Sequence, residues 1–224
     1  MVFVLAVEQW TSSTPLAGSW RVHGSSPMCF VDLAKVFDRV PRGVLWGVLQ
    51  EYGVPDPLIG AVRSLYDRCQ SLVCIAGSKL DLFPVRVGLH QGCPLSRILF
   101  IIFMDRISRR SQGAEGVRFG DLRIRSLLFA DDVVMLASLG RDLQLSQERF
   151  EAEYEAAGMR ISTSNSQTMV LSWKRCPLGV GNEILPQVEE FKYLRILFTS
   201  EGRMVREIDR RIDEASAVMW ALSW

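Results

Sequence analysis

The sequence has few histidines, almost no net charge and no long hydrophobic run, and each shortage excludes a class of protein. Its two histidines and five cysteines follow no zinc-ligand spacing, which argues against a zinc-stabilised domain. A formal net charge of +1 gives no overall positive field, although a local basic groove can exist on a neutral protein. The longest apolar stretches, such as ILFIIFM, fall far below the ~18 residues of a membrane span.

The sequence shows no repeats or low-complexity linkers, and we expect no secretory leader. The opening MVFVLAVE is apolar but has no basic residues before it, and an odd number of cysteines favours reduced thiols. We therefore expect an intracellular protein, nuclear or cytoplasmic, that is not secreted and has no membrane partner. With 224 residues, 48% of them hydrophobic, the chain can bury a sizeable core. Nothing in the sequence indicates its oligomeric state.

Apolar periodicity and turn residues predict a mixture of strands and helices. Helices are predicted at 42–52, 57–69, from Pro94 onward, at 141–157 up to Gly158, and at 203–223. Strands are predicted at MCFVDL, on both sides of Asp131–Asp132, at about 167–172 and 191–198, and as a hairpin of SLVCIAG and FPVRVG around GSKLD. The helix after Pro94 is apolar on nearly every side, which predicts burial all round. Residues 11–28 read as loops, with a short helical piece near PLAGSW. Hairpins among helices favour an α+β fold.

Two adjacent acidic residues interrupt the apolar run LLFADDVVML. Asp131 and Asp132 could form an ordinary hairpin turn, but no Gly or Asn accompanies them as tight hairpins prefer. Asp32 also ends an apolar strand, and if the strands are neighbours the carboxylates converge. Like charges ~4 Å apart repel by roughly 4 kcal/mol, so cations such as Mg²⁺ would be needed between them. Side-chain alternation along a strand predicts one principal ligand and one secondary carboxylate.

The segment GLHQGCPLS is a second candidate site. Gln91 suits the edge of a base or sugar, Gly92 allows close approach of the backbone, and Pro94 and Ser96 begin a helix whose N–H groups could face a phosphate. The alternative is an ordinary loop into a buried helix. We interpret His90 as a surface substitution without a role as ligand or base.

Five segments in order resemble the palm of reverse transcriptases from non-LTR (LINE-class) retrotransposons. They are FVDLAKVFDRVP, GLHQGCPLSRILF, LLFADDVVML, AAGMRISTSNSQTMV and FKYLRILF. The resemblance implies an α+β polymerase-type palm, an antiparallel sheet with helices packed on one face, with the fingers mostly missing. It divides the chain into a poorly matched N-terminal remnant (1–27), the palm (28–200) and a C-terminal amphipathic helix (201–224) leading toward an absent thumb.

The resemblance also implies roles for matched residues. Asp32 and Asp131 would bind two Mg²⁺ ions, with Mn²⁺ a possible substitute, and Asp132 would be the less direct catalytic carboxylate. Phe37 matches the aromatic gate that favours deoxynucleotides, and Tyr193 lies in the hairpin that supports the primer. The nascent base pair and template would contact Gln91, Gly92, Pro94 and Ser96. The implied partners are an RNA template, a DNA primer and dNTPs, and the implied reaction is RNA-directed DNA synthesis.

Some positions depart from the family pattern. Asn165 stands where a lysine usually protonates pyrophosphate, Arg195 replaces a glycine, and the 31 residues before Asp32 lack the fingers pattern. We therefore expect the isolated chain to be weak or inactive. The alternative is a catalytically inactive, retrotransposon-derived remnant that binds nucleic acid or protein. A small two-metal nuclease would leave Phe37 and the Gln-Gly-Cys-Pro segment unexplained.

Among the basic clusters, Arg118, Arg123 and Arg125 are the best candidates for nucleic-acid contact.

Overall fold

The structure is a computed structural model that describes residues 26–33, 35–72, 74–75, 78–79, 81–113, 116–119, 122–129, 131–170, 176–194, 196–201 and 205–222. The chain forms two compact units. The first contains the described residues of Met1–Asp32, Gly113–Glu148 and Ser162–Trp224, and the second contains those of Leu33–Gln112 and Arg149–Ile161. The expected helix near PLAGSW and the departure at Arg195 lie outside the described residues.

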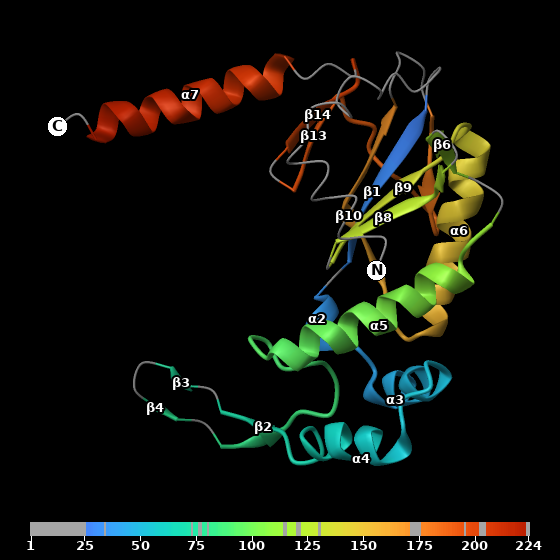
Figure 1. The fold of residues 1–224 in the computed structure, drawn as a ribbon, viewed down its shortest axis with the longest axis vertical. Coiled ribbons are helices and arrows are strands. Elements are labelled where there is room, and N and C mark those ends of the chain that lie inside the picture. Colours follow the sequence, from blue (N-terminus) through green and yellow to red (C-terminus); the bar gives the residue numbers. More distant parts are fainter. Residues whose placement is uncertain are drawn as a thin grey trace. The chain divides into compact units, whose positions relative to one another are not determined.

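A four-stranded sheet organises the first unit. Its order is β10 (Ile161–Val170), β1 (Pro27–Leu33), β9 (Asp132–Leu136) and β8 (Ser126–Phe129), as Figure 1 shows. Strand β9 is antiparallel to both β1 and β8. The mixed α+β class with an antiparallel sheet is therefore confirmed.

Both faces of the two central strands are buried. Met28, Phe30, Val134 and Leu136 share one face, and Cys29, Val31, Val133 and Met135 share the other; all eight are at most 4% exposed. Burial on both faces explains why MCFV and VVML are continuous apolar runs without polar alternation. The two runs end at Asp32 and Asp132, where exposure rises.

Aromatic side chains of a hairpin cover one face of this sheet. The hairpin pairs β13 (Glu190–Tyr193) with β14 (Ile196–Thr199), and the ring centroids of Phe191 and Phe30 are 3.9 Å apart. This confirms the strands predicted at 191–198. Two small hairpins, β6 (Val117–Phe119) with β7 (Leu122–Ile124) and β11 (Gly179–Val180) with β12 (Glu183–Ile184), complete the described strands of the unit.

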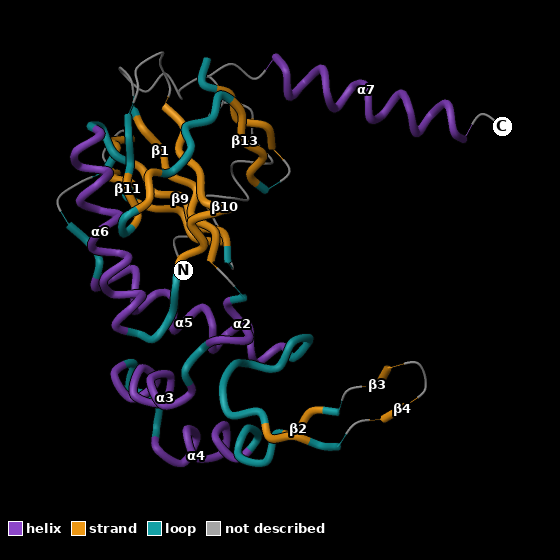
Figure 2. The backbone as a smooth tube through the Cα atoms, turned by 180° about the vertical axis from the view of Figure 1, so that it is seen from behind, coloured by secondary structure: helices purple, strands orange, loops and turns teal. Residues whose placement is uncertain are grey.

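Helices dominate the second unit (Figure 2). They are α2 (Val36–Arg39), α3 (Arg42–Glu51), α4 (Asp56–Ser64) and α5 (Pro94–Arg110). The predicted hairpin is present: β2 (Gln70–Ser71) pairs with β5 (Phe83–Pro84), and β3 (Cys74–Ile75) pairs with β4 (Ser78–Lys79). Within β3 and β4, Ile75 pairs with Ser78, which lies in the GSKLD segment.

Two predictions about α5 and β10 need correction. Helix α5 buries Leu99, Phe100 and Phe103, but Ile98 and Ile101 are 56% and 60% exposed, so burial on every side is wrong. Strand β10 begins at Ile161, several residues before the predicted start. The first half of β10 is polar, so no apolar pattern indicates a strand there. This half is a strand because β10 pairs with β1.

Helix α6 (Gly140–Ala156) begins in the first unit and ends in the second. It stops at Gly158, whose φ of +80° suits glycine, and the N–H of Met159 donates to the carbonyl of Tyr154. The predicted helix and its glycine stop are confirmed.

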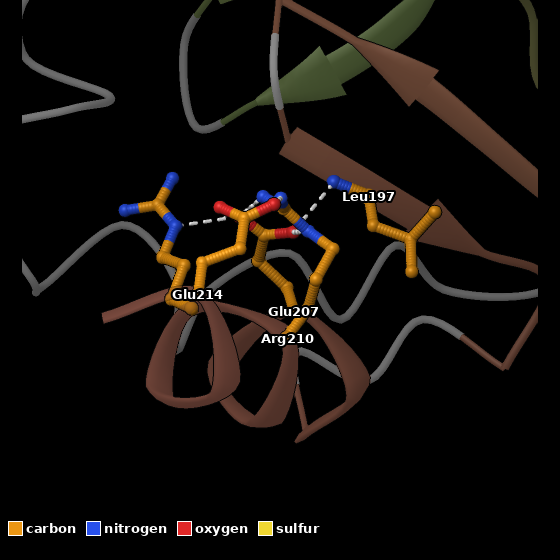
Figure 3. A network of polar contacts seen from close by, with 5 residues as sticks. Leu197, Glu207, Arg210 and Glu214 are labelled. Carbon is orange, nitrogen blue, oxygen red and sulfur yellow. Dashed lines mark hydrogen bonds and ion pairs between the residues drawn. The ribbon is translucent and has the colours of Figure 1, made fainter. Parts of the chain in front are cut away.

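Helix α7 (Val205–Leu222) attaches to β14 through a polar face (Figure 3). Glu207 is 2% exposed and accepts hydrogen bonds from the backbone N–H of Leu197 (2.9 Å), from Arg210 and from Arg211. Burial opposes the charge on Glu207, but these hydrogen bonds together outweigh it and lower the pKa of the carboxyl to about 2. The apolar residues Ile208, Ile212 and Met219 remain more than half exposed.

Among the residues that the structure describes, no helix is both long and apolar enough to cross a membrane. All five cysteines are free thiols, as predicted.

Candidate active site

The sheet brings the predicted carboxylates to one edge of the first unit. Asp32 and Asp132 are directly opposite each other in the antiparallel pairing of β1 and β9. Directly opposed residues project from the same face, so these two carboxylates are neighbours. Phe129 pairs with Asp132, which leaves Asp131 in the tight turn between β8 and β9, where it is exposed. A turn and a carboxylate cluster therefore coexist at this point.

Strand β10 holds Asp32 from the other side. The backbone N–H of Asp32 donates to the hydroxyl of Ser166 (3.0 Å), and that buried hydroxyl donates to the carbonyl of Ser162 (2.7 Å). The amide Nδ2 of Asn165 donates to Oδ2 of Asp32 (3.1 Å). The sequence singled out Asn165 only as a missing lysine. The structure adds that its amide binds a carboxylate of the candidate site.

The carboxylates affect one another electrostatically. Partial burial, followed by the negative charges of Asp131 and Asp32, raises the pKa of Asp132. Tyr193 lies nearby in the core at 6% exposure, and its hydroxyl has no hydrogen-bond partner among the described residues. Burial and then the charge of Asp132 raise the pKa of Tyr193 as well. Negative charge is thus concentrated at this edge of the sheet.

The donor set suits a hard divalent cation. In the described part of the chain, no three His, Cys, Asp or Glu side chains converge as a ready-made metal site. Mg²⁺, however, commonly uses only one or two protein carboxylates and completes its coordination with water and phosphate oxygens. Asp32 with one residue of the Asp131–Asp132 pair meets that requirement. Which of the two is the principal ligand stays a prediction.

The loop before α5 carries the second set of predicted residues, all in the second unit. Gln91 donates its side-chain amide to Oδ1 of Asp38 (3.0 Å). Gly92 has a φ of +81° with open space around its Cα, so the turn itself requires glycine there, rather than a close contact. A Cβ on Gly88 would lie 2.7 Å from the carbonyl oxygen of Asp38, so this loop packs tightly against α2.

Pro94 and Ser96 begin α5 as predicted, but they face different surroundings. Pro94 is exposed at the first position of the helix. Ser96 is 1% exposed, and its hydroxyl lies 3.0 Å from the hydroxyl of Tyr66, so any substrate contact of Ser96 would use its backbone. Phe37, on α2, is half-buried and packs on Phe100 with ring centroids 4.7 Å apart.

Sequence reasoning missed Arg42 as the residue that holds this loop. Its guanidinium donates to the carbonyls of Tyr66, Val85, Val87 and Gly88 over 2.8–3.2 Å and lies 4.9 Å from the ring centre of Tyr66. Backbone carbonyls carry no sequence signature, so no motif could have indicated these contacts.

Comparison with known proteins gives a consistent result. The family model described as reverse transcriptase (RNA-dependent DNA polymerase) matches residues 7–197. A Pol polyprotein from the type-2 retrotransposable element R2DM of Drosophila melanogaster is 27% identical over 191 residues, which cover 79% of this chain and 18% of the relative. An R2 Pol polyprotein of Nasonia vitripennis is 28% identical over 78% of this chain and 18% of the relative. The chain thus spans about a fifth of the length of these relatives.

Solved structures support the fold alone. Apo telomerase from Candida tropicalis, truncated from its C-terminal domain, matches with a TM-score of 0.62 at 15% identity, over 88% of this chain and 38% of that protein. Telomerase from the same organism in complex with a fragment of telomeric RNA matches with a TM-score of 0.59 at 14% identity, over 88% of this chain and 32% of that protein.

Proposed function

The chain belongs to the reverse transcriptase (RNA-dependent DNA polymerase) family, and on that premise we propose that it carries out templated nucleotidyl transfer with the carboxylate edge of its palm-type sheet. The observation that carries the proposal is the direct opposition of Asp32 and Asp132, with Asp131 in the adjoining turn. An edge that concentrates negative charge is costly unless cations bind there.

In the proposed reaction, the 3′-hydroxyl oxygen of a DNA primer attacks the α-phosphorus of a dNTP. A new P–O bond forms, the bond from the α-phosphorus to its bridging oxygen breaks, pyrophosphate leaves, and the hydroxyl proton is released. Mg²⁺ or Mn²⁺ bound by Asp32 and Asp131 would stabilise negative charge on the phosphate and activate the hydroxyl. The Asn165 amide would orient the Asp32 carboxylate, and Asp132 would be the less direct catalytic carboxylate.

The remaining roles follow from matched motifs. We propose that residues 28–200 act as the palm and that 201–224 lead away from it. Within 28–200, Phe37 would exclude ribonucleotides, and Tyr193 would belong to the protein hairpin that supports the primer. The nascent base pair and template would contact Gln91, Gly92, Pro94 and Ser96. The hairpin β13–β14 and the start of α5 at Pro94 support this assignment.

A local basic surface supports an RNA–DNA partner. Arg118 and Arg123 are opposed across β6 and β7 and both are exposed, so this hairpin presents positive charge to the solvent. By contrast, Arg106 and Arg110 pair with Glu51, and Arg109 pairs with Asp105. We therefore propose Arg118 as a phosphate contact in preference to the arginines of α5.

The test is primer extension on an RNA template with dNTPs and Mg²⁺. Extension by the unmodified chain, lost in Asp131→Ala and abolished by chelation, supports the proposal. Equal product with Asp131→Ala would mean background synthesis and would rule out the assigned site. Asp67→Ala, which changes an exposed carboxylate outside the cluster, is the matched control.

A catalytically inactive, nucleic-acid-binding remnant is the second candidate. The amide of Asn165 on Asp32 favours it, because an amide cannot donate the proton that a lysine supplies to pyrophosphate. Tight RNA–DNA binding without any Mg²⁺-dependent extension distinguishes this candidate from the first.

A further inference from the structure

A cysteine and a histidine meet on the second unit, whereas the candidate carboxylates belong to the first unit. Cys69 follows α4 and His90 lies in the loop before α5, 21 positions later in the chain. The Sγ of Cys69 and the Nε2 of His90 are 2.8 Å apart, within hydrogen-bonding distance, and the contact is exposed to solvent. A nucleophile beside a base at this distance is the arrangement that activates thiols in enzymes.

The imidazole is held in place by its neighbours. The His90 ring stacks on Tyr66 with centroids 4.6 Å apart. Tyr66 is itself 2% exposed and fixed by the hydroxyl of Ser96 and by the guanidinium of Arg42 above its ring. His90 lies at the surface, as predicted, and these contacts give its ring a supported orientation.

We propose that Cys69 is an activated thiol and a modification site for small electrophiles and for peroxide. As the Cys69 sulfur attacks an electrophile, the imidazole of His90, 2.8 Å away, accepts the thiol proton. With hydrogen peroxide, the sulfur attacks one oxygen, the O–O bond breaks, and the departing hydroxide takes the proton from the imidazolium as water. Peroxide is reduced, and Cys69 is oxidised to a sulfenic acid.

The geometry favours thiol chemistry over a metal site. A thiolate and an imidazole that share one tetrahedral Zn²⁺ stand about 3.5 Å apart, because the Zn–S and Zn–N bonds are ~2.3 and ~2.0 Å. The observed separation of 2.8 Å is too short for that arrangement. The described residues also hold no third His, Cys, Asp or Glu that completes a metal cluster here.

The chain contains its own reference thiols for a test. Cys74 is exposed on the neighbouring strand β3, has no histidine contact among the described interactions, and reports ordinary thiol reactivity. Cys29 is fully buried in β1, so its protection reports that the sheet is folded. Limiting iodoacetamide with mass-spectrometric readout at each cysteine therefore compares all three in one sample.

We expect Cys69 to react about tenfold faster than Cys74 despite its lower exposure. His90→Phe keeps the ring stacked on Tyr66 but removes both nitrogens, and it brings Cys69 to the rate of Cys74 or below while Cys29 stays protected. Dilute peroxide followed by a sulfenic-acid trap labels Cys69 in the unmodified chain before Cys74. Equal rates at Cys69 and Cys74, an unchanged Cys69 rate in His90→Phe, or protection of Cys69 by one equivalent of Zn²⁺ would overturn the proposal.

Discussion

Asp32 has the most specific surroundings of the candidate site. Its backbone is fixed by Ser166 and its carboxylate by the Asn165 amide, so strand β10 determines where this side chain points. An amide holds a carboxylate without neutralising it. The site therefore keeps its negative charge while lacking the acid that a lysine at position 165 would supply.

Replacing Asn165 by lysine should restore that acid. We expect Asn165→Lys to raise the rate of Mg²⁺-dependent primer extension at least about tenfold, since a positioned general acid typically contributes 10²–10⁴-fold. Single-turnover kinetics measure the chemical step directly. Asn165→Met, similar in length but unable to donate a proton, is the control, and equal rates for the Lys and Met variants would contradict the assignment.

Asp132 should reduce the stability of the folded chain at neutral pH. Its pKa is raised in the folded state, so ionisation costs more there than in the unfolded chain. Asp132→Asn should therefore raise the melting temperature at pH 7. The gain in melting temperature should shrink as the pH falls toward ~3.9, the ordinary pKa of aspartate, because Asp132 then becomes protonated in both the folded and the unfolded chain. Thermal unfolding of the variant and the unmodified chain from pH 7 to pH 4 tests this prediction. A gain in melting temperature that grows as the pH falls would contradict it.

At the scale of elements, α7 shows that a helix can attach by its polar side. Glu207 is enclosed by two arginines and a backbone N–H, whereas Ile208 and Ile212 face outward. Sequence periodicity predicted the helix and its apolar stripe. That periodicity does not indicate that Glu207, on the charged side of the helix, is buried.

Glu207→Ala should release the start of α7 from β14. The N–H of Leu197 would lose its acceptor, at a cost of about 1–3 kcal/mol, so its amide hydrogen should exchange roughly tenfold faster or more. Because the pKa of Glu207 is lowered to about 2, its contribution to the stability of the α7–β14 attachment should be complete above the ordinary pKa of glutamate. That contribution should disappear as the pH falls toward 2. Hydrogen exchange resolved at Leu197 measures both effects.

Glu214→Ala is the matched control, because Glu214 is exposed and contacts only the outer side of Arg210 among its described ion pairs. An exposed pair of this kind contributes little. Equal acceleration in the two variants would show that Glu207 does not anchor the helix.

At the scale of the whole molecule, near-neutrality makes nucleic-acid binding depend on local arginines. Arg118→Ala should weaken binding to an RNA–DNA duplex and reduce the slope of log affinity against log salt by about 1, the loss of one phosphate contact. Fluorescence anisotropy over a salt series gives the slope. Arg109→Ala, whose charge is paired with Asp105, should leave the slope unchanged, and an identical change in both variants would contradict a specific β6–β7 surface.

Local patterns predicted much of this molecule, and distant contacts explain the rest. The α+β class, the carboxylate turn and the start of α5 follow from periodicity, Pro94 and motif order. The polar half of β10, the exposed side of α5 and the Cys69–His90 contact do not. Each of these depends on which neighbour covers a segment after folding, and a one-dimensional pattern contains no such information.

The two apolar strands at the centre of the sheet have a consequence for folding fidelity. Because MCFV and VVML are buried on both faces, a shift of pairing by one residue would exchange one apolar face for another at little cost. Asp32 and Asp132 remove that ambiguity, since such a shift would draw a carboxylate inward among buried valines. The acidic residues proposed for chemistry therefore also fix how β1 and β9 align as the chain folds.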